Sequence, residues 1–484
     1  MDSFEPKDVN RRVFVSGLGF VSLGLVFSTL LGGCESLLEQ IRKRPLRRRL
    51  RTGSAEVDNS IAIYKDAVAK MQALPSSNPR SWAAQAALHG SAGGFNFCQH
   101  GTDHFFSWHR AYLFYFEKIC QELTGEKSFG LPYWNWNRDP GLHPAFTTPN
   151  SVLNHPRNNT SVAGNTAFND TTMNTIFSDS NFFTFGSQLE GTPHNTAHVV
   201  LGLDMGGGGS PIDPIFWPHH CMVDYSWAKW NIELENDTTN DGGWIGTSWD
   251  HFVDGKGNPT TVSAGITTLM PFFSYRYESS AVGRFGAAAD LSALGARDLE
   301  KIKARIKQGA EVRFDVKRRI SIARGATLPV ARPFSAQTRV TAADLAALLE
   351  SSTRRERIFL SINYVHPPEA DDFFVRVFIN LPGVNAQTPT DDIHYAGSFA
   401  FFGTHTRDSG AHHHKTDFLV NVSDTLNTLI RGGVVRADAP LSIHLVAVPV
   451  TTRFNRPGMQ LMLKEIDLVI SPVSVHSRGE APKP

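Results

Sequence analysis

The sequence predicts a multidomain α+β protein, in which a mainly α core is followed by an all-β sandwich. At 484 residues the chain is too long for one ordinary domain. Residues 54–280 alternate helical segments with loops rich in Asn, Thr, Gly and Pro, and no period-2 pattern dominates there. Beyond residue 311, short apolar runs such as 373–380 are bounded by Pro, Gly and Asp, which is typical of strands.

Residues 1–53 are expected to be an export segment rather than part of the fold. The Arg-Arg pair at 11–12 resembles a twin-arginine signal, and residues 13–33 form an uncharged apolar run about as long as a short membrane span. The Leu-Gly-Gly-Cys run at 31–34 resembles a lipobox, which would make Cys34 a lipidated N-terminus. The alternative is a retained membrane anchor, with the basic run 42–51 at a membrane face. We therefore expect an exported protein, periplasmic or attached to the envelope.

Composition sets the other boundaries and excludes one class of function. Residues 54–280 form the expected core, 281–310 a connector, 311–472 the sandwich and 473–484 a tail. The net charge of +1 argues against a nucleic-acid partner. Four cysteines give no disulfide framework. A four-helix bundle is the economical architecture for the core, because facing helices present metal ligands from a rigid frame.

Two histidine clusters dominate the core. In the first, His89 ends an alanine-rich helical run that Gly90 stops. His100 comes from a loop or helix start, and His109 lies near the start of a helix expected to run from residue 108 to residue 125.

The second cluster consists of His194, His198 and His220. His194 and His198 stand four residues apart, so on a helix they share one face. His220 heads another expected helix. Neutral imidazole suits copper, zinc, iron and nickel, and three histidines without a carboxylate leave coordination positions open for an exogenous ligand. The two triples predict a dinuclear metal site, but their spacing does not choose the metal.

Two longer patterns carry a resemblance to a known family. Residues 100–117 read His-x4-Phe-Phe-x-Trp-His-Arg-x2-Leu-x3-Glu, and residues 213–224 read Asp-Pro-x-Phe-Trp-x2-His-x3-Asp. They resemble the CuA and CuB signatures of the tyrosinase, catechol oxidase and haemocyanin family, and residues 131–136 and 395–403 are similar to polyphenol oxidases. The resemblance implies two copper ions, with dioxygen and small phenols as partners. It assigns CuA to His89, His100 and His109, and CuB to His194, His198 and His220.

The same resemblance implies roles for residues beside the ligands. In several family members a cysteine at the place of Cys98 is joined by a thioether bond to the histidine at the place of His100; the alternative is a buried, unmodified thiol. Glu190 and Asn195 would hold a water that deprotonates a phenol, whose pKa is about 10. Alternatively, Glu190 only orients a ligand histidine.

The resemblance also bears on substrate access and latency. Gly207 falls where many plant catechol oxidases carry a bulky aromatic residue, and Val199 would form the neighbouring wall. The sandwich is expected to cover the copper site and make the full-length chain latent. Phe454, or with less support Phe401 or Phe402, would enter the pocket; the alternative is that all three pack in the sandwich core.

These features predict a tyrosinase, which ortho-hydroxylates monophenols and oxidises o-diphenols to o-quinones. The alternatives are a catechol oxidase, a haemocyanin-like oxygen carrier, and a dinuclear zinc hydrolase, which would usually include Asp or Glu among its ligands. His104 and His219 are not assigned as ligands, because the signatures place the ligands elsewhere. Asp224 either supports the site or pairs with a base such as Arg110.

Overall fold

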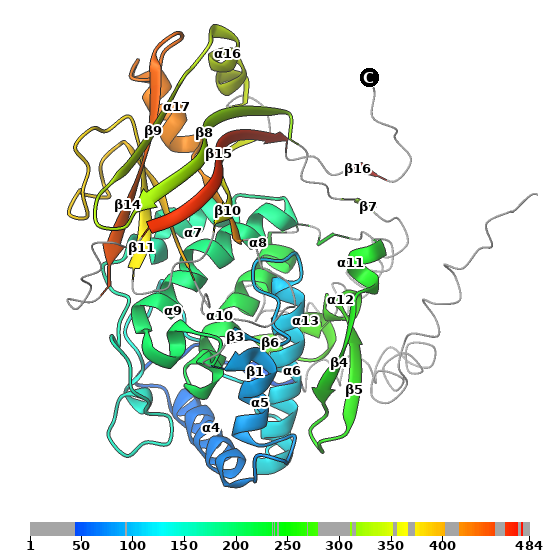
Figure 1. The fold of residues 1–484 in the computed structure, drawn as a ribbon. Helices are drawn as coiled ribbons and strands as arrows, with labels where there is room; N and C mark the ends of the chain where they lie inside the picture. The colour runs from blue at the N-terminus through cyan, green and yellow to red at the C-terminus, as the bar shows by residue number, and fades with distance from the viewer. Residues whose placement is uncertain are drawn as a thin grey trace, which may run out of the picture.

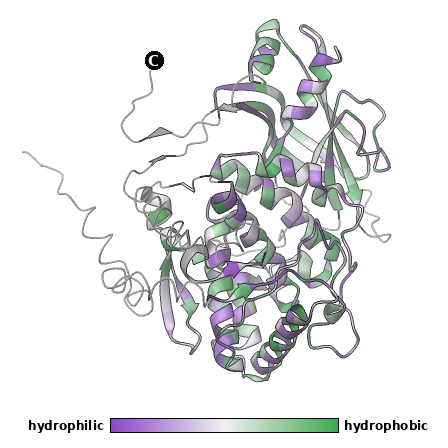
Figure 2. Ribbon diagram, turned by 180° about the vertical axis from the view of Figure 1, so that it is seen from behind, coloured by the Kyte–Doolittle hydropathy of each residue, from purple (hydrophilic) through white to green (hydrophobic). Residues whose placement is uncertain are grey.

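The computed structural model describes residues 44–91, 94–234, 236, 238–239, 242–268, 270–278, 310–311, 316–351, 356–365, 373–401, 416–450, 460–472 and 476–477. A helical core carries the N-terminal half of this chain, and a β-sandwich lies against one end of it (Figure 1). Seen from behind, the two parts again lie in contact (Figure 2). The predicted fold class is confirmed.

Four helices organise the core: α4 (Ala55–Ala73), α5 (Trp82–His89), α6 (Phe105–Thr124) and α10 (Phe216–Ala228). The side chains of Ser54 and Ser81 accept hydrogen bonds from the first-turn amides of α4 and α5, which fixes where both helices begin. Gly125 ends α6 in a left-handed conformation. All thirteen residues of α10 are buried. Both helices predicted around the first histidine cluster are present.

Shorter elements complete the core. They are η1 (Pro144–Phe146), η2 (Thr166–Phe168), α7 (Asp170–Phe177), α8 (Phe182–Leu189), the short π-helix η3 (Glu190–His194), α9 (Asn195–Leu201), η4 (Leu203–Gly206), η5 (Ser210–Ile212), the short π-helix η6 (Lys229–Glu233), α11 (Gly242–Gly246), α12 (Ala264–Thr267), α13 (Met270–Phe273), β1 (Leu46–Arg47), β2 (Gly90–Ser91), β3 (Gly94–Phe95), β4 (Ser248–Val253), β5 (Pro259–Ser263) and β6 (Arg276–Tyr277). Among the described residues, no helix is long and apolar enough to cross a membrane.

Residues 44–50, which include most of the basic run, belong to the core, and this corrects the expected boundary of the export segment. Strand β1 pairs in parallel with β6, and Arg47 is fully buried. The Arg47 guanidinium bonds Glu117 on α6 and Asp224 on α10, both at 2.9 Å, and stacks on the Tyr275 ring. The partners of Arg47 lie 70 and 177 residues away in the sequence. Local composition cannot show such partners, so the basic residues were assigned to the export segment or to a membrane face. The apolar run 13–33 lies outside the described residues.

Asp224 joins α6 and α10, the two helices that carry the predicted ligands His109 and His220. It pairs with Arg110 of α6 and accepts hydrogen bonds of 2.6 Å from Tyr275 and Tyr277. Burial alone would raise the pKa of Asp224, but the guanidinium groups of Arg110 and Arg47 hold that pKa below its usual range. Asp224 therefore both supports the site and forms the ion pair expected with Arg110.

Replacing Arg47 with alanine is expected to lower the free energy of unfolding by about 3–5 kcal/mol, because two buried carboxylates lose their common partner. Arg49 is the matched control on the same segment, since its pair with Asp139 is about one third exposed. Arg49→Ala should cost about 1 kcal/mol or less. Chemical unfolding of both variants measures the difference, and equal losses would contradict the central role of Arg47.

The C-terminal part is a sandwich of two four-stranded antiparallel sheets. One has the order β13-β10-β15-β8 and the other β12-β11-β14-β9. Their apolar faces meet in one core, to which all eight strands contribute and onto which two helices pack. The elements are β8 (Arg318–Pro329), β9 (Phe334–Arg339), α16 (Ala342–Ser351), β10 (Glu356–Val365), β11 (Phe373–Ile379), β12 (Tyr395–Ala400), β13 (Thr416–Asn421), α17 (Ser423–Arg431), β14 (Pro440–Pro449) and β15 (Gln460–Pro472); β7 (Ala310–Glu311) pairs with β16 (His476–Ser477).

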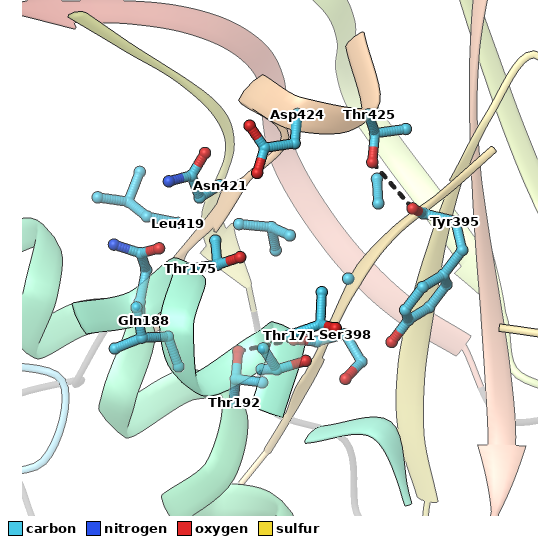
Figure 3. Close-up of a pocket in the computed structure, with 15 residues that line it drawn as sticks. Thr171, Thr175, Gln188, Thr192, Tyr395, Ser398, Leu419, Asn421, Asp424 and Thr425 are labelled. Atoms are coloured by element: carbon cyan, nitrogen blue, oxygen red, sulfur yellow. Dashed lines mark hydrogen bonds between the residues drawn. The ribbon is translucent and has the colours of Figure 1, made fainter. Parts of the chain in front are cut away.

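The edge strand β12 attaches the sandwich to the core. Its free edge faces η3 and α9, where the Thr192 hydroxyl donates to the Ser398 carbonyl and the Asn195 amide donates to the Ala400 carbonyl, both at 2.8 Å. Carbonyl groups two residues apart on an edge strand point in the same direction. The carbonyls of Ser398 and Ala400 therefore both face the core and accept these two hydrogen bonds. Beside this contact, a pocket lies between α7 and α8 on one side and β12, β13 and α17 on the other, lined by hydroxyl and amide groups (Figure 3).

Candidate metal centre

All six predicted ligand histidines converge in the helical core. His89 is the last residue of α5, His100 lies in the loop before α6, and His109 is in the second turn of α6. His194 ends η3, His198 lies on α9, and His220 on α10. Each is at most 7% exposed. Among the described residues, two groups of buried side chains could hold an ion: His89, Cys98, His100 and His109, and His194, His198, His219 and His220.

In the first group, hydrogen-bond contacts of Nδ1 orient the three histidine rings. Nδ1 of His89 donates to the Gly208 carbonyl at 2.7 Å, and Nδ1 of His109 donates to the Phe105 carbonyl at 2.8 Å. Nδ1 of His100 lies 3.1 Å from Oε1 of Glu190. A neutral imidazole that donates through Nδ1 keeps its lone pair on Nε2. All three rings therefore have Nε2 available as a metal ligand.

Two histidines of the second group follow the same rule. Nδ1 of His198 donates to the Met205 carbonyl at 2.6 Å. The amide nitrogen of Asn195 is directed at Ala400, so its oxygen faces Nδ1 of His194, at 2.8 Å, and accepts that proton. On His220, no described group bonds Nδ1, and Nε2 lies 3.3 Å from Nε2 of His198.

The spacing of these nitrogens fits a bound cation. Nε2 of His89 lies 3.1 Å from Nε2 of His100, and the corresponding His198–His220 distance is 3.3 Å. In the His89–His100 pair the Nδ1 contacts place a lone pair on both Nε2 atoms, and facing lone pairs repel each other without a cation between them. Two nitrogens each about 2.0 Å from one ion lie about 3.3 Å apart in tetrahedral geometry. The buried Nε2 of His109 likewise has no hydrogen-bond partner among the described groups.

Burial keeps the ligand rings neutral. It lowers the pKa of His89 to about 4 and that of His194 to about 3. Burial, followed by the neighbouring histidines, also lowers the pKa of His100 and of His220 well below the usual value. Neutral imidazole is the form that binds transition metals. The centre is therefore ready to bind metal near pH 7 without first losing a proton.

The two groups adjoin each other. The rings of His109 and His220 stack with centroids 4.3 Å apart, and those of His100 and His194 stack at 5.1 Å. No carboxylate belongs to either group among the described residues. Three imidazoles of the first group and four of the second thus lie side by side, and imidazole is a donor that suits copper. The two copper sites expected from the signatures thus have a matching donor set.

Cys98 and Glu190 lie beside the first half-site. The sulfur of Cys98 is buried within 4.8 Å of the ligand nitrogens of its group. Oε1 of Glu190 accepts a 2.7 Å hydrogen bond from the Gly101 amide in addition to its contact with His100. Burial raises the pKa of Glu190 to about 8. Glu190 thus contacts the ring of His100 and the loop before α6 at once.

The sandwich covers the side of the centre that was expected to admit substrate. Val199 is 1% exposed and packs against Phe374 and Ala400 of the sandwich. The amide of Asn195 is held by Ala400, so in this closed arrangement its nitrogen is already engaged. A Cβ built on Gly207 meets no atom within 4 Å, so this position leaves open space.

Of the three residues predicted to block the site, the structure describes only Phe401. Phe401 is wrong for that role, because it packs in the sandwich core against Phe373, Phe399 and Phe418. Its position at the end of β12 turns the ring inward. Phe402 and Phe454 lie outside the described residues.

The sequence predicted that His104 and His219 pack or hydrogen-bond near the site without being ligands, but it did not single out Trp136 as the partner of His219. His104 stacks on Trp244 with centroids 5.4 Å apart and is outside both ligand groups, as expected. His219 in contrast is fully buried within the second group. Trp136 donates a 3.0 Å hydrogen bond to its Nδ1. The adjacent His-His pair was the one sequence signal for this additional ring.

Comparison with known proteins agrees with this geometry. Residues 79–158 and 144–233 match the common central domain of tyrosinase. A tyrosinase of Hahella sp. (strain CCB-MM4) is 27% identical over 46% of this chain and 61% of its own length, and a chloroplastic polyphenol oxidase of Malus domestica is 31% identical over 38% and 41%. The match thus spans less than two thirds of either relative. The solved structure of a latent apple tyrosinase covers 88% of this chain and 97% of its own, at 20% identity and a TM-score of 0.61, so the two share a fold that includes the sandwich.

Proposed function

Because the chain belongs to the tyrosinase and polyphenol oxidase family and carries that family's type-3 centre of two copper ions, we propose that it oxidises phenols with dioxygen. The observation that carries the proposal is the convergence of six buried, neutral imidazoles in two adjoining triads without a carboxylate ligand. The proposed reactions are ortho-hydroxylation of monophenols and oxidation of o-diphenols to o-quinones. When bound, the copper pair supplies the two-electron exchange with dioxygen that both reactions need.

The chain's own residues orient the ligands and would handle the phenol proton. The carbonyl groups of Gly208, Phe105 and Met205 fix three ligand rings, so no ring has to reorient during turnover. We propose that Glu190 and Asn195 hold the water that accepts the phenol proton once the sandwich has moved away. The side-chain nitrogen of Asn195 would then donate its hydrogen bond to that water instead of to the Ala400 carbonyl. The side-chain oxygen of Asn195 would keep its hydrogen bond with His194.

Oxygen consumption by the copper-loaded chain, measured with tyrosine and with a catechol, tests the proposed function. Consumption with both substrates is the expected result. Consumption with the catechol alone would make the chain a catechol oxidase. Reversible oxygen binding without consumption of either would identify a carrier and overturn the proposal.

Gly207 is expected to control the preference for monophenols. It precedes Gly208, whose carbonyl holds the ligand His89, and its surroundings are open. A ring placed there by Gly207→Phe would narrow the approach to that half-site, and the ratio of tyrosine to catechol rates should fall about tenfold or more. Gly207→Ala is the control and should leave the ratio unchanged. An unchanged ratio in the Phe variant would remove Gly207 from this role.

Asn195→Leu should lower the same ratio of tyrosine to catechol rates, because this variant cannot hold the proposed water that accepts the phenol proton.

A thioether between Cys98 and His100 is also proposed, since the buried sulfur lies beside the ligand nitrogens. Forming a bond from Sγ to a ring carbon breaks one S–H and one C–H bond and releases two protons and two electrons, which reduce one dioxygen to hydrogen peroxide. Bound copper would supply the route for these electrons. The peptide that contains both residues should therefore be two hydrogen masses lighter after copper loading in air. The Cys98→Ala chain should show no such loss. A Cys98 thiol that reacts fully with an alkylating reagent after unfolding would contradict the crosslink.

We further propose that the chain is exported, through the twin-arginine-like segment, and that Cys34 is lipidated or the segment is retained as an anchor. Any processing must leave residues 44–50 in place, because Arg44, Arg47 and Leu50 are buried in the core. Fractionation of cells and N-terminal sequencing of the mature chain would test this; a mature chain that begins after Leu50 would contradict it.

A further inference from the structure

His219 brings a fourth imidazole into the second half-site. Its ring centroid lies 4.6 Å from that of His198, 5.0 Å from that of His220 and 5.1 Å from that of His194. It is fully buried, and one nitrogen of each of the four rings lies within 4.8 Å of the others. Distance and burial alone would therefore make His219 a copper ligand as good as its neighbours.

Hydrogen bonding separates His219 from the ligands. Nδ1 of His89, His109, His194 and His198 faces an oxygen that can only accept, so each of these rings carries its proton on Nδ1. Nδ1 of His219 instead faces Nε1 of Trp136, at 3.0 Å. An indole nitrogen can only donate.

This contact leaves His219 without a lone pair for copper. A neutral imidazole has one nitrogen that carries a proton and one that carries a lone pair. Trp136 takes the lone pair on Nδ1, so the proton must sit on Nε2. Neither nitrogen can then coordinate, whichever of them lies nearer to the ion.

We propose that Trp136 excludes His219 from the copper centre by fixing its tautomer, so that CuB is held by three imidazoles and keeps a coordination position open. Trp136 is in this account a positioning residue that acts through His219. A fourth imidazole would fill the position that an exogenous ligand needs. The inference rests on the copper centre and is independent of which phenol is oxidised.

The tautomer can be observed directly in the full chain. Nitrogen-15 spectra of histidine-labelled protein distinguish a protonated ring nitrogen from a lone-pair nitrogen, and the signals of His219 are assigned by their loss in His219→Asn. The proton is expected on Nε2, both without metal and with Cu(I) bound. A His219 nitrogen that shifts on Cu(I) loading, as the ligand nitrogens do, would overturn the proposal. The tautomer itself is read from the unsubstituted chain, and His219→Asn serves only to assign the signals.

Trp136→Phe tests the cause, because it removes the indole N–H and keeps an aromatic side chain. His219 should then move its proton to Nδ1 and bind with Nε2, so that transfer of copper to a Cu(I) chelator slows about tenfold, equivalent to about 1.4 kcal/mol. His219→Asn in the same chain should restore the original rate.

Trp134→Phe is the matched control. Trp134 also lies beside His219, at 6.3 Å between centroids, but its indole donates to the Asp139 carbonyl. Its copper transfer should equal that of the unsubstituted chain. If Trp136→Phe behaved like Trp134→Phe in both the spectra and the transfer rate, Trp136 would have no such role.

Discussion

Replacing His109 or His220 with alanine is expected to remove about one copper ion per chain and to abolish oxygen consumption with a catechol. Each substitution leaves two imidazoles for one ion, and the two rings also stack on each other between the half-sites. Loss of either ring would therefore remove one ligand and also the stacking contact between the two half-sites. Copper analysis and an oxygen electrode measure both effects.

His104→Ala is the control for these variants. It lies in the same stretch of sequence, stacks on Trp244 and belongs to neither ligand group. This variant should keep two copper ions and most of its activity. A His109 variant that retains two ions, or a His104 variant that loses one, would refute the assignment of the ligands.

Separating the sandwich from the core is expected to raise the rate of catechol oxidation at least about tenfold. The sandwich covers Val199 and engages Thr192 and Asn195, which flank the ligand His194. While the two parts belong to one chain, this contact forms at a high effective concentration. Cleavage within the connector 281–310 followed by dilution removes that advantage, so the core should become accessible.

Substitution of one side chain at the contact tests the same blocking by the sandwich in the intact chain, with a smaller expected effect. Thr192→Val deletes the hydrogen bond to the Ser398 carbonyl, which contributes about 1 kcal/mol, and should raise the open fraction about fivefold. Thr172→Val is the control, since the Thr172 hydroxyl donates to Thr166 within the core. A full-length chain that is already as active as the separated core would show that the sandwich does not block the site.

Long spaced signatures allowed the ligands and the helices around them to be predicted. The metal requires particular residue types at fixed helical spacing, so His109 on α6 and His194 with His198 are visible in the sequence. The strands of the sandwich could be predicted for a similar reason, because apolar runs bounded by turn residues produced β10, β11 and β14 near their expected places.

Contacts between distant residues could not be predicted in the same way. Arg47 looked like part of a membrane-facing basic run, because the carboxylates that neutralise it come from α6 and α10. Phe401 was a lesser candidate to block the site, with packing in the sandwich core as the alternative, and only its place directly after β12 shows that its ring faces the sandwich core. The role of His219 depends on the direction of one indole N–H, which no pattern of residue types specifies.

Metal analysis of the purified full-length chain tests the central claim most directly. Two copper ions per chain are expected, and both should be removed by a Cu(I) chelator together with all oxygen consumption and be restored by copper alone. A chain that holds zinc, or a single copper ion at full activity, would contradict a dinuclear copper centre built on these six histidines.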